Sequence, residues 1–326
     1  MQTTLTYSWL LQQEQINSRV GNAQTEMEQV DIDKHIVTMD LAASTAKQFT
    51  QILVKQERLK LNQMATLQAN EVLKAISERV SAGRSSTIEM RMAEVEIVRM
   101  QLAVEDTEHD LKASQYQMSS LWGKPGIQFR VNGNLFALPV LSSLDKELDK
   151  LKKSPYITQF ATATRIAQSQ LELARIEAKS QWQFSAGLRR YEATDDFGLV
   201  AGVSVPFGAS DRNAGTISTL QAKQDVLAVE QVALMQKLDS QLYVQLQEIA
   251  HARHVIDAFE KTIIPTLEVT LKEAVRAFEL GQLSYSQWSD IRRDLLNAQS
   301  ELLNTYESLH LQHFEIQRLT GASISL

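Results

Sequence analysis

The sequence predicts a mainly α-helical protein with a small β part, in which two long antiparallel helical hairpins arise from an internal duplication. Three observations predict this class. A glycine turn of the same design occurs at Gly83 and again at Gly281. A long stretch precedes each turn, and the first, from Asn22 to Ala82, contains neither glycine nor proline. A heptad repeat of apolar residues follows each turn, as expected of helices that pack side by side.

The two turns carry the same order of signals. Glycine just after a helix end tolerates the positive φ that a C′ position requires. Three residues further on, Ser86 and Ser284 are typical N-cap residues, and Glu89 and Gln287 stand where a capping box needs them. Gly83 and Gly281 are therefore expected at the tips of two helical hairpins.

The helices after the turns repeat their apolar residues every heptad. One seam has matching members in both copies: Met90, Ile97, Val104, Leu111 and Met118, then Trp288, Leu295, Leu302, Leu309 and Ile316. A second seam on the first helix contains Ile88, Val95, Leu102, His109 and Tyr116. Two seams favour a helix with neighbours on both sides, as in a closed wall of helices. An ordinary coiled coil is the alternative.

Taken in order, the remaining elements follow from alternation, helix signals and breakers. The predicted strands share period-two alternation and cover residues 3–11, 181–191 and 197–207. The predicted helices are uninterrupted by glycine and cover 22–82, 87–121, 141–152, 161–180, 216–264 and the final segment to Thr320. We expect Pro265 to kink the chain, which then continues as helix to Leu280.

The hairpin of residues 181–207 has one apolar face and one small or polar face. Its apolar face includes Trp182, Phe184, Leu188, Phe197, Leu199 and Val203. Strands of this length and pattern suit a transmembrane barrel, although a hairpin packed on a soluble core alternates in the same way.

The duplication also defines the domain organisation. We interpret residues 1–326 as one domain with two pseudo-repeats: an incomplete first repeat at 1–123, a connector and helix at 124–180, and a second repeat at 181–321. The opening strand matches the end of the 197–207 strand. The 181–191 strand has no counterpart, so we expect a further strand upstream of Met1.

Composition excludes several functions. The net charge is −6, with 44% hydrophobic residues and no basic patch, so nucleic acid is not an expected partner. Cysteine is absent, and no apolar stretch reaches the length of a membrane-spanning helix. The residues after Met1 lack the features of a signal peptide. Taken alone, this start indicates the cytoplasm, unless the true N-terminus is missing.

No catalytic constellation, phosphate-binding loop or cofactor motif is present, so the sequence predicts neither an enzyme nor a cofactor. Two histidine pairs, His251/His254 and His310/His313, have spacing that a metal could use. No third ligand is apparent, and we predict no metal site. The methionines are interpreted as core-filling residues.

The chain as a whole resembles the TolC family of outer-membrane efflux proteins, and within it the CzcC-like branch of heavy-metal efflux. The residues that carry this resemblance are Gly187–Phe207, Asp211–Gly215 and the two tip turns.

The resemblance implies a homotrimer whose strands form one barrel in the lipid of the outer membrane and whose helices form a periplasmic tunnel. The tips would dock on a periplasmic adaptor, a membrane fusion protein, which joins an inner-membrane RND-type pump. Family protomers contribute one strand more than this sequence offers. An N-terminally incomplete protein without its export signal is therefore the simplest expectation.

The resemblance also places site residues. The docking tips would comprise Gly83, Ser86, Thr87, Ile88, Gly281, Leu283, Ser284 and Tyr285. Five residues at the tips are expected to be semi-exposed: Thr87, Ile88, Leu283, Tyr285 and also Trp288. Packing of these side chains within the hairpin is the alternative. Glu89 and Asp290 would narrow the periplasmic entrance, or act only as a capping-box residue and a first-turn acid.

The predicted function is a passive export duct in the outer membrane for heavy-metal cations. A duct for drugs or for type I protein secretion is an alternative of the same class. A soluble coiled-coil scaffold, with the 181–207 hairpin packed on helices, is an alternative of another class.

Overall fold

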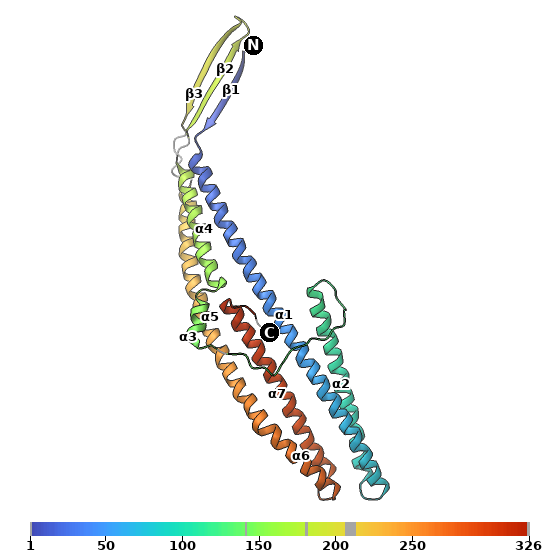
Figure 1. Ribbon diagram of the computed structural model, residues 1–326. Helices are drawn as coiled ribbons and strands as arrows, with labels where there is room; N and C mark the ends of the chain where they lie inside the picture. The colour runs from blue at the N-terminus through green and yellow to red at the C-terminus, as the bar shows by residue number, and fades with distance from the viewer. Residues whose placement is uncertain (1, 141, 180–181, 206–212, 325–326) are drawn as a thin grey trace. The chain divides into compact units, whose positions relative to one another are not determined.

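The computed structural model describes residues 2–140, 142–179, 182–205 and 213–324 (Figure 1). Its helices and strands, in chain order, are β1 Gln2–Leu10, α1 Gln13–Ser81, α2 Thr87–Leu121, α3 Leu144–Leu151, α4 Pro155–Ala178, β2 Gln183–Tyr191, β3 Asp196–Ser204, α5 Ala214–Ala258, the π-helix Phe259–Ile263, α6 Ile264–Glu279 and α7 Tyr285–Thr320. The predicted class, mainly α with a small β part, is confirmed.

The chain divides into two compact units. The first comprises residues 1–38 and 151–239, and the second comprises residues 39–150 and 240–326. The first unit contains the three strands, α4 and the beginnings of α1 and α5. The second unit contains α2, α6 and α7 with the remaining parts of α1 and α5.

Most helix boundaries lie close to the predicted ones, and two begin earlier. Helix α1 starts at Gln13 and passes through Gly21. A glycine inside a helix costs about 1 kcal/mol of helix stability relative to alanine, but it does not interrupt α1. Helix α4 starts at Pro155 rather than near residue 161, because proline is favoured in the first helical turn.

The expected interruption at Pro265 takes a specific form. Residues Phe259–Ile263 form a π-helix, and α6 begins directly after it at Ile264. Pro265 therefore lies in the first turn of α6, where its missing N–H costs little.

The strands form one antiparallel sheet in the order β1-β2-β3. Leu5 of β1 lies opposite Leu188 of β2, which in turn lies opposite Leu199 of β3. The expected extensions of these strands to residues 181 and 206–207, and residues 211–212 of the family motif, lie outside the described residues.

Within the first unit, α1 and α4 lie side by side and are linked by surface ion pairs. Arg19 and Glu177 are 2.9 Å apart, and Arg165 and Glu28 are 2.7 Å apart. All four side chains are at least one third exposed, so these ion pairs align the helices more than they stabilise them.

Candidate functional site

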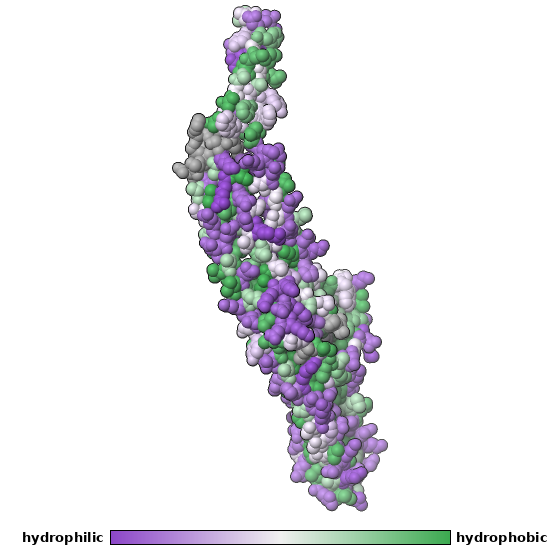
Figure 2. Space-filling view, turned by 60° about the vertical axis from the view of Figure 1, so that its left-hand side comes forward, coloured by the Kyte–Doolittle hydropathy of each residue, from purple (hydrophilic) through white to green (hydrophobic). Residues whose placement is uncertain are grey.

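The sheet has one continuous apolar face. Cross-strand rows place Leu5, Leu188 and Leu199 together, and then Trp9, Phe184 and Val203. These side chains lie on the surface, and the exposed fractions reach 79% for Leu5 and 91% for Leu199. Figure 2 shows hydrophobic side chains on the visible surface of the strands. An exposed apolar face of this extent requires a partner or a lipid environment.

The opposite face carries small residues. Its rows contain Thr6, Gly187 and Val200, followed by Ser8, Ser185 and Gly202. A Cβ atom on Gly187 would lie 2.7 Å from the Leu5 carbonyl oxygen, so only glycine allows β1 to approach there. Along β2, residues of this face are half-buried while those of the apolar face are exposed. This difference indicates that the sheet curves around its small-residue face.

Aromatic and charged side chains lie at the two ends of the apolar face. Near the helices, the ring of Phe184 lies 6.4 Å from that of Trp9 and 6.3 Å from that of Trp182. At the hairpin turn, Arg190 pairs with Asp195 at 2.7 Å and covers the ring of Phe197. An apolar band with aromatic flanks is the pattern of a membrane-spanning barrel wall.

The strand residues singled out from the sequence all lie on this exposed face. Trp182, Phe184, Phe197 and Leu199 have exposed fractions of 50%, 37%, 63% and 91%. This exposure argues against the scaffold alternative, which requires these side chains to pack on helices.

The two tip turns have the predicted backbone. Gly83 and Gly281 adopt φ values of 69° and 75°, which glycine reaches without strain. Ser86 and Ser284 are the N-caps of α2 and α7, and Ser284 forms the predicted capping box with Gln287.

The capping box predicted for Glu89 is wrong. The Ser86 hydroxyl accepts the N–H of Ile88, and no capping box with Glu89 forms. Instead, a carboxylate oxygen of Glu89 accepts the N–H of Tyr285 at 3.4 Å. The acid therefore caps the first turn of α7, on the other hairpin, where a negative charge is favourable.

The expected semi-exposure of Tyr285 and Trp288 is also wrong. Both are buried, at 3% and 4% exposure, in a tip core with Ile76, Ala93, Ala274 and Phe278. Aromatic rings fill the space where the four helix ends meet, with the rings of Phe278 and Trp288 6.2 Å apart. Thr87 and Ile88 remain exposed as predicted, and Leu283 is half-buried.

The two apolar seams of α2 have different environments. Ile97 and Met118 of the first seam are buried. In the second seam Ile88, Val95, Leu102 and Tyr116 are each more than half exposed. The second seam therefore forms an apolar stripe on the surface of the protomer.

Sequence reasoning missed a buried charge near the tip. Arg292 of α7 is 3% exposed, covers the ring of Trp288, and lies 3.8 Å from a carboxylate oxygen of Glu96 on α2. Burial lowers the pKa of its guanidinium. The sequence did contain a signal for this burial, since Arg292 falls between Trp288 and Leu295 on the apolar seam.

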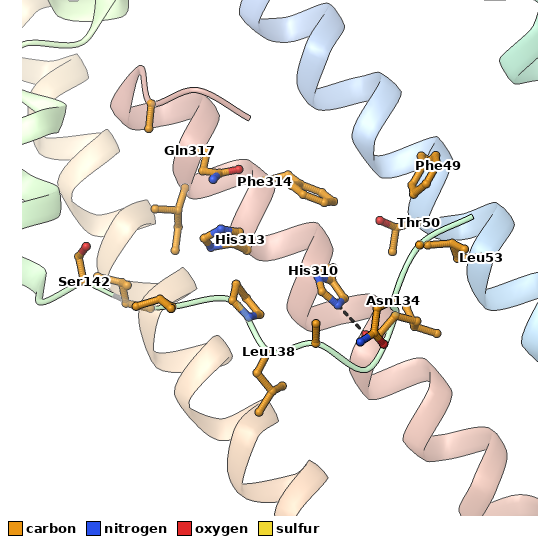
Figure 3. A pocket seen from close by; sticks show the side chains of 18 of the residues that line it. Phe49, Thr50, Leu53, Asn134, Leu138, Ser142, His310, His313, Phe314 and Gln317 are labelled. Atoms are coloured by element: carbon orange, nitrogen blue, oxygen red, sulfur yellow. Dashed lines mark hydrogen bonds between the residues drawn. The ribbon is translucent and has the colours of Figure 1, made fainter. Parts of the chain in front are cut away.

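A cavity of about 570 Å³ in the second unit is lined by the connector, α1 and α7 (Figure 3). His310 and His313 both face it. His310 Nε2 is hydrogen-bonded to the Leu135 carbonyl at 2.8 Å, which fastens the connector to α7. Burial, reinforced by neighbouring His310, lowers the pKa of His313.

The described residues contain no group of three or more histidines, cysteines or acidic residues that could hold a metal ion. The same part of the chain has no helix long and apolar enough to cross a membrane.

The sequence matches no family model. It is 24% identical over 306 residues to the cobalt-zinc-cadmium resistance protein CzcC of Cupriavidus metallidurans, covering 94% of this chain and 73% of CzcC.

Solved structures share the fold. CusC matches with a TM-score of 0.83 and 15% identity, over 99% of this chain and 78% of CusC. The outer-membrane channel OprN matches with a TM-score of 0.82 and 14% identity, over 98% of this chain and 74% of OprN. The open state of the MtrE outer-membrane channel of Neisseria gonorrhoeae matches with a TM-score of 0.80 and 13% identity, over 99% of this chain and 79% of MtrE.

The chain therefore shares its fold with outer-membrane channels such as OprN and MtrE. In sequence it is similar to the resistance protein CzcC. The resemblance drawn from residues 187–215 and the tip turns is confirmed.

Proposed function

We propose that this protein is the passive outer-membrane duct of a tripartite efflux system and that it exports heavy-metal cations from the periplasm. The observation that best supports a duct is the structure of the sheet, whose apolar face is exposed and whose glycine-rich face is concave. An open sheet edge is not tolerated in lipid, because its backbone groups would lack partners. Closure of a barrel by three copies of the chain removes these edges.

The same symmetry accounts for the helices. The exposed second seam of α2, from Ile88 to Tyr116, offers an apolar stripe that a neighbouring protomer can cover. A wall of such helices continues the barrel as a tunnel. The outer-membrane lipid and two further copies of the chain are thus its first partners.

The hairpin tips are the proposed docking surface for a periplasmic adaptor, which joins an RND-type pump. The exposed Thr87 and Ile88 would make direct contact. Gly83, Ser86, Gly281, Leu283 and Ser284 would shape the turns, while buried Tyr285 supports them from within. Glu89 and Asp290 are the acids proposed at the entrance, where they would attract cations.

Metal cargo rests on the similarity to CzcC, a cobalt-zinc-cadmium resistance protein. We expect a strain that lacks this gene to become sensitive to cobalt, zinc or cadmium salts, and the gene to restore growth. Sensitivity to drugs alone would replace metal cargo with drug cargo. No change with any compound would contradict an efflux role.

Docking is tested by a photo-crosslinking amino acid placed at Thr87 or at Lys112, which are both exposed on α2. An adaptor captured from Thr87 but not from Lys112 supports the tip as the docking surface. Equal capture from both positions contradicts it.

A further inference from the structure

The concave face of the sheet carries one charged side chain away from the hairpin turn, Arg189 of β2. Its cross-strand neighbours are Thr4 of β1 and Gly198 of β3. Gly198 has no side chain, and the ring of Tyr191 lies 3.4 Å from where its Cβ atom would be. The rows further from the turn are uncharged and contain Thr6, Gly187 and Val200, then Ser8, Ser185 and Gly202.

Hydrogen bonding leaves most of this guanidinium available. Arg189 Nε donates to the Thr4 hydroxyl at 3.1 Å. Among the described residues, no carboxylate forms an ion pair with Arg189, whereas neighbouring Arg190 pairs with Asp195 at 2.7 Å. The two arginines are adjacent in sequence but lie on opposite faces of the sheet, so one faces the concave side and the other does not.

One acid shares the concave face with Arg189. Asp196 lies opposite Tyr191, one row nearer the hairpin turn, at the rim of the sheet. Arg189 is therefore the innermost charge on this face. Any solute that moves along the concave face passes it.

We propose that Arg189 determines the ion selectivity of the duct and favours anions, or metal bound to anionic ligands, over free cations. The inference rests on the proposed function, because it requires three copies of the sheet to close around a shared lumen. Three arginines at one level would then form a positive ring below the extracellular rim. Rings of basic side chains select for anions in pores, because they raise the local concentration of anions and repel cations.

The ring and the entrance acids would have opposite effects on free cations. Glu89 and Asp290 favour entry of cations, while Arg189 opposes their passage through the barrel. Cargo that has exchanged water for chloride, carboxylate or thiolate ligands carries less positive charge and meets a lower barrier.

The test is the reversal potential of the whole protein in planar lipid bilayers under a KCl gradient. Arg189→Gln is expected to shift the reversal potential toward cation preference, and Arg189→Glu to shift it further. Arg189→Lys should retain the wild-type value, because it keeps the charge. The difference between wild type and Arg189→Gln should shrink at high salt, where the ring is screened.

Two controls separate charge at this position from other effects. Arg190→Gln removes a charge of the same type from the other face, and Thr4→Ala removes the hydrogen bond while leaving the charge. Both should keep wild-type selectivity.

An unchanged reversal potential in both Arg189→Gln and Arg189→Glu overturns the inference. So does an equal shift in Arg190→Gln. If Arg189→Gln fails to insert, the reversal potentials of Arg189→Lys and Arg189→Glu are compared instead, and equal values overturn the inference. Absence of conductance in the wild-type protein overturns the duct itself and this inference with it, and that result is distinct from a conducting but unselective channel.

Discussion

Arg79 of α1 and Phe278 of α6 join the two hairpins at their tips. The guanidinium donates a hydrogen bond to the Phe278 carbonyl and lies 4.4 Å from the centre of its ring. A single side chain thus satisfies a carbonyl in the last turn of one helix and covers the edge of the aromatic tip core. Both contacts are favourable for a cation at a helix C-terminus.

We expect Arg79→Ala to destabilise the tip by about 1–3 kcal/mol, because a hydrogen bond from a charged group is lost from a half-buried carbonyl. Hydrogen exchange of peptides from the ends of α1 and α6 would accelerate. Arg84→Ala, at an exposed position in the first turn, is the control and should leave exchange unchanged. Equal exchange in both variants would show that the contact is energetically neutral.

The turns were predictable from the sequence because each is specified locally. Gly83 and Gly281 adopt positive φ, and Ser86 and Ser284 cap the next helices, through interactions within a few residues. The heptad seam likewise indicated the buried face of each helix. Strand alternation was sufficient to place Leu188 and Leu199 on the same face.

Contacts between the two hairpins were not predictable in this way. Glu89 had a local partner available in Ser86, yet its carboxylate accepts from Tyr285 on the other hairpin. Tyr285 and Trp288 follow a turn, which normally means exposure, but four helix ends converge there and bury them. Both errors arose from packing between residues that are distant in the chain, which single-sequence patterns do not record.

Glu96 of α2 is partly buried and forms an ion pair with the buried Arg292 of α7. Glu96→Ala should destabilise the tip by about 3–5 kcal/mol, because it leaves the Arg292 guanidinium buried without a counter-charge. The double variant Glu96→Ala/Arg292→Met should recover much of that loss, since an apolar side chain then replaces the ion. Chemical denaturation of the detergent-solubilised protein measures both.

A matched control for this pair is available on the same helix. Glu94 pairs with Arg91 at 3.1 Å on the exposed surface of α2. Glu94→Ala should change the unfolding free energy by less than about 1 kcal/mol. If the single Glu96 variant is no less stable than this control, the pair contributes nothing to the tip.

Leu199 of β3 and its neighbour Val200 lie on opposite faces of the sheet. Leu199→Arg should impair insertion, because an arginine near the middle of a lipid-facing barrel wall costs about 2–4 kcal/mol. Val200→Arg should be better tolerated, since Val200 lies opposite Gly187 on the concave face, where the charge does not enter lipid. The amount of protein in purified outer membranes measures insertion. Equal loss of both variants would contradict the assignment of the apolar face to lipid.

His313 is half-buried beside the connector, and its pKa is lowered by burial first and by neighbouring His310 second. Nearby Glu147 acts in the opposite sense, while Arg253 and Lys150 add to the lowering. In the unfolded chain the imidazole takes up a proton at about pH 6.5. The folded state binds that proton only at lower pH, so the unfolding free energy should fall as the pH decreases below about 6.5.

His313→Gln cannot titrate and should flatten this dependence of the unfolding free energy on pH. The control His251→Gln, at an exposed position on α5, should not flatten it. Thermal unfolding measured from neutral to mildly acidic pH distinguishes the two. A pH dependence in His313→Gln as steep as that of the wild type would show that other groups control acid stability of the second unit.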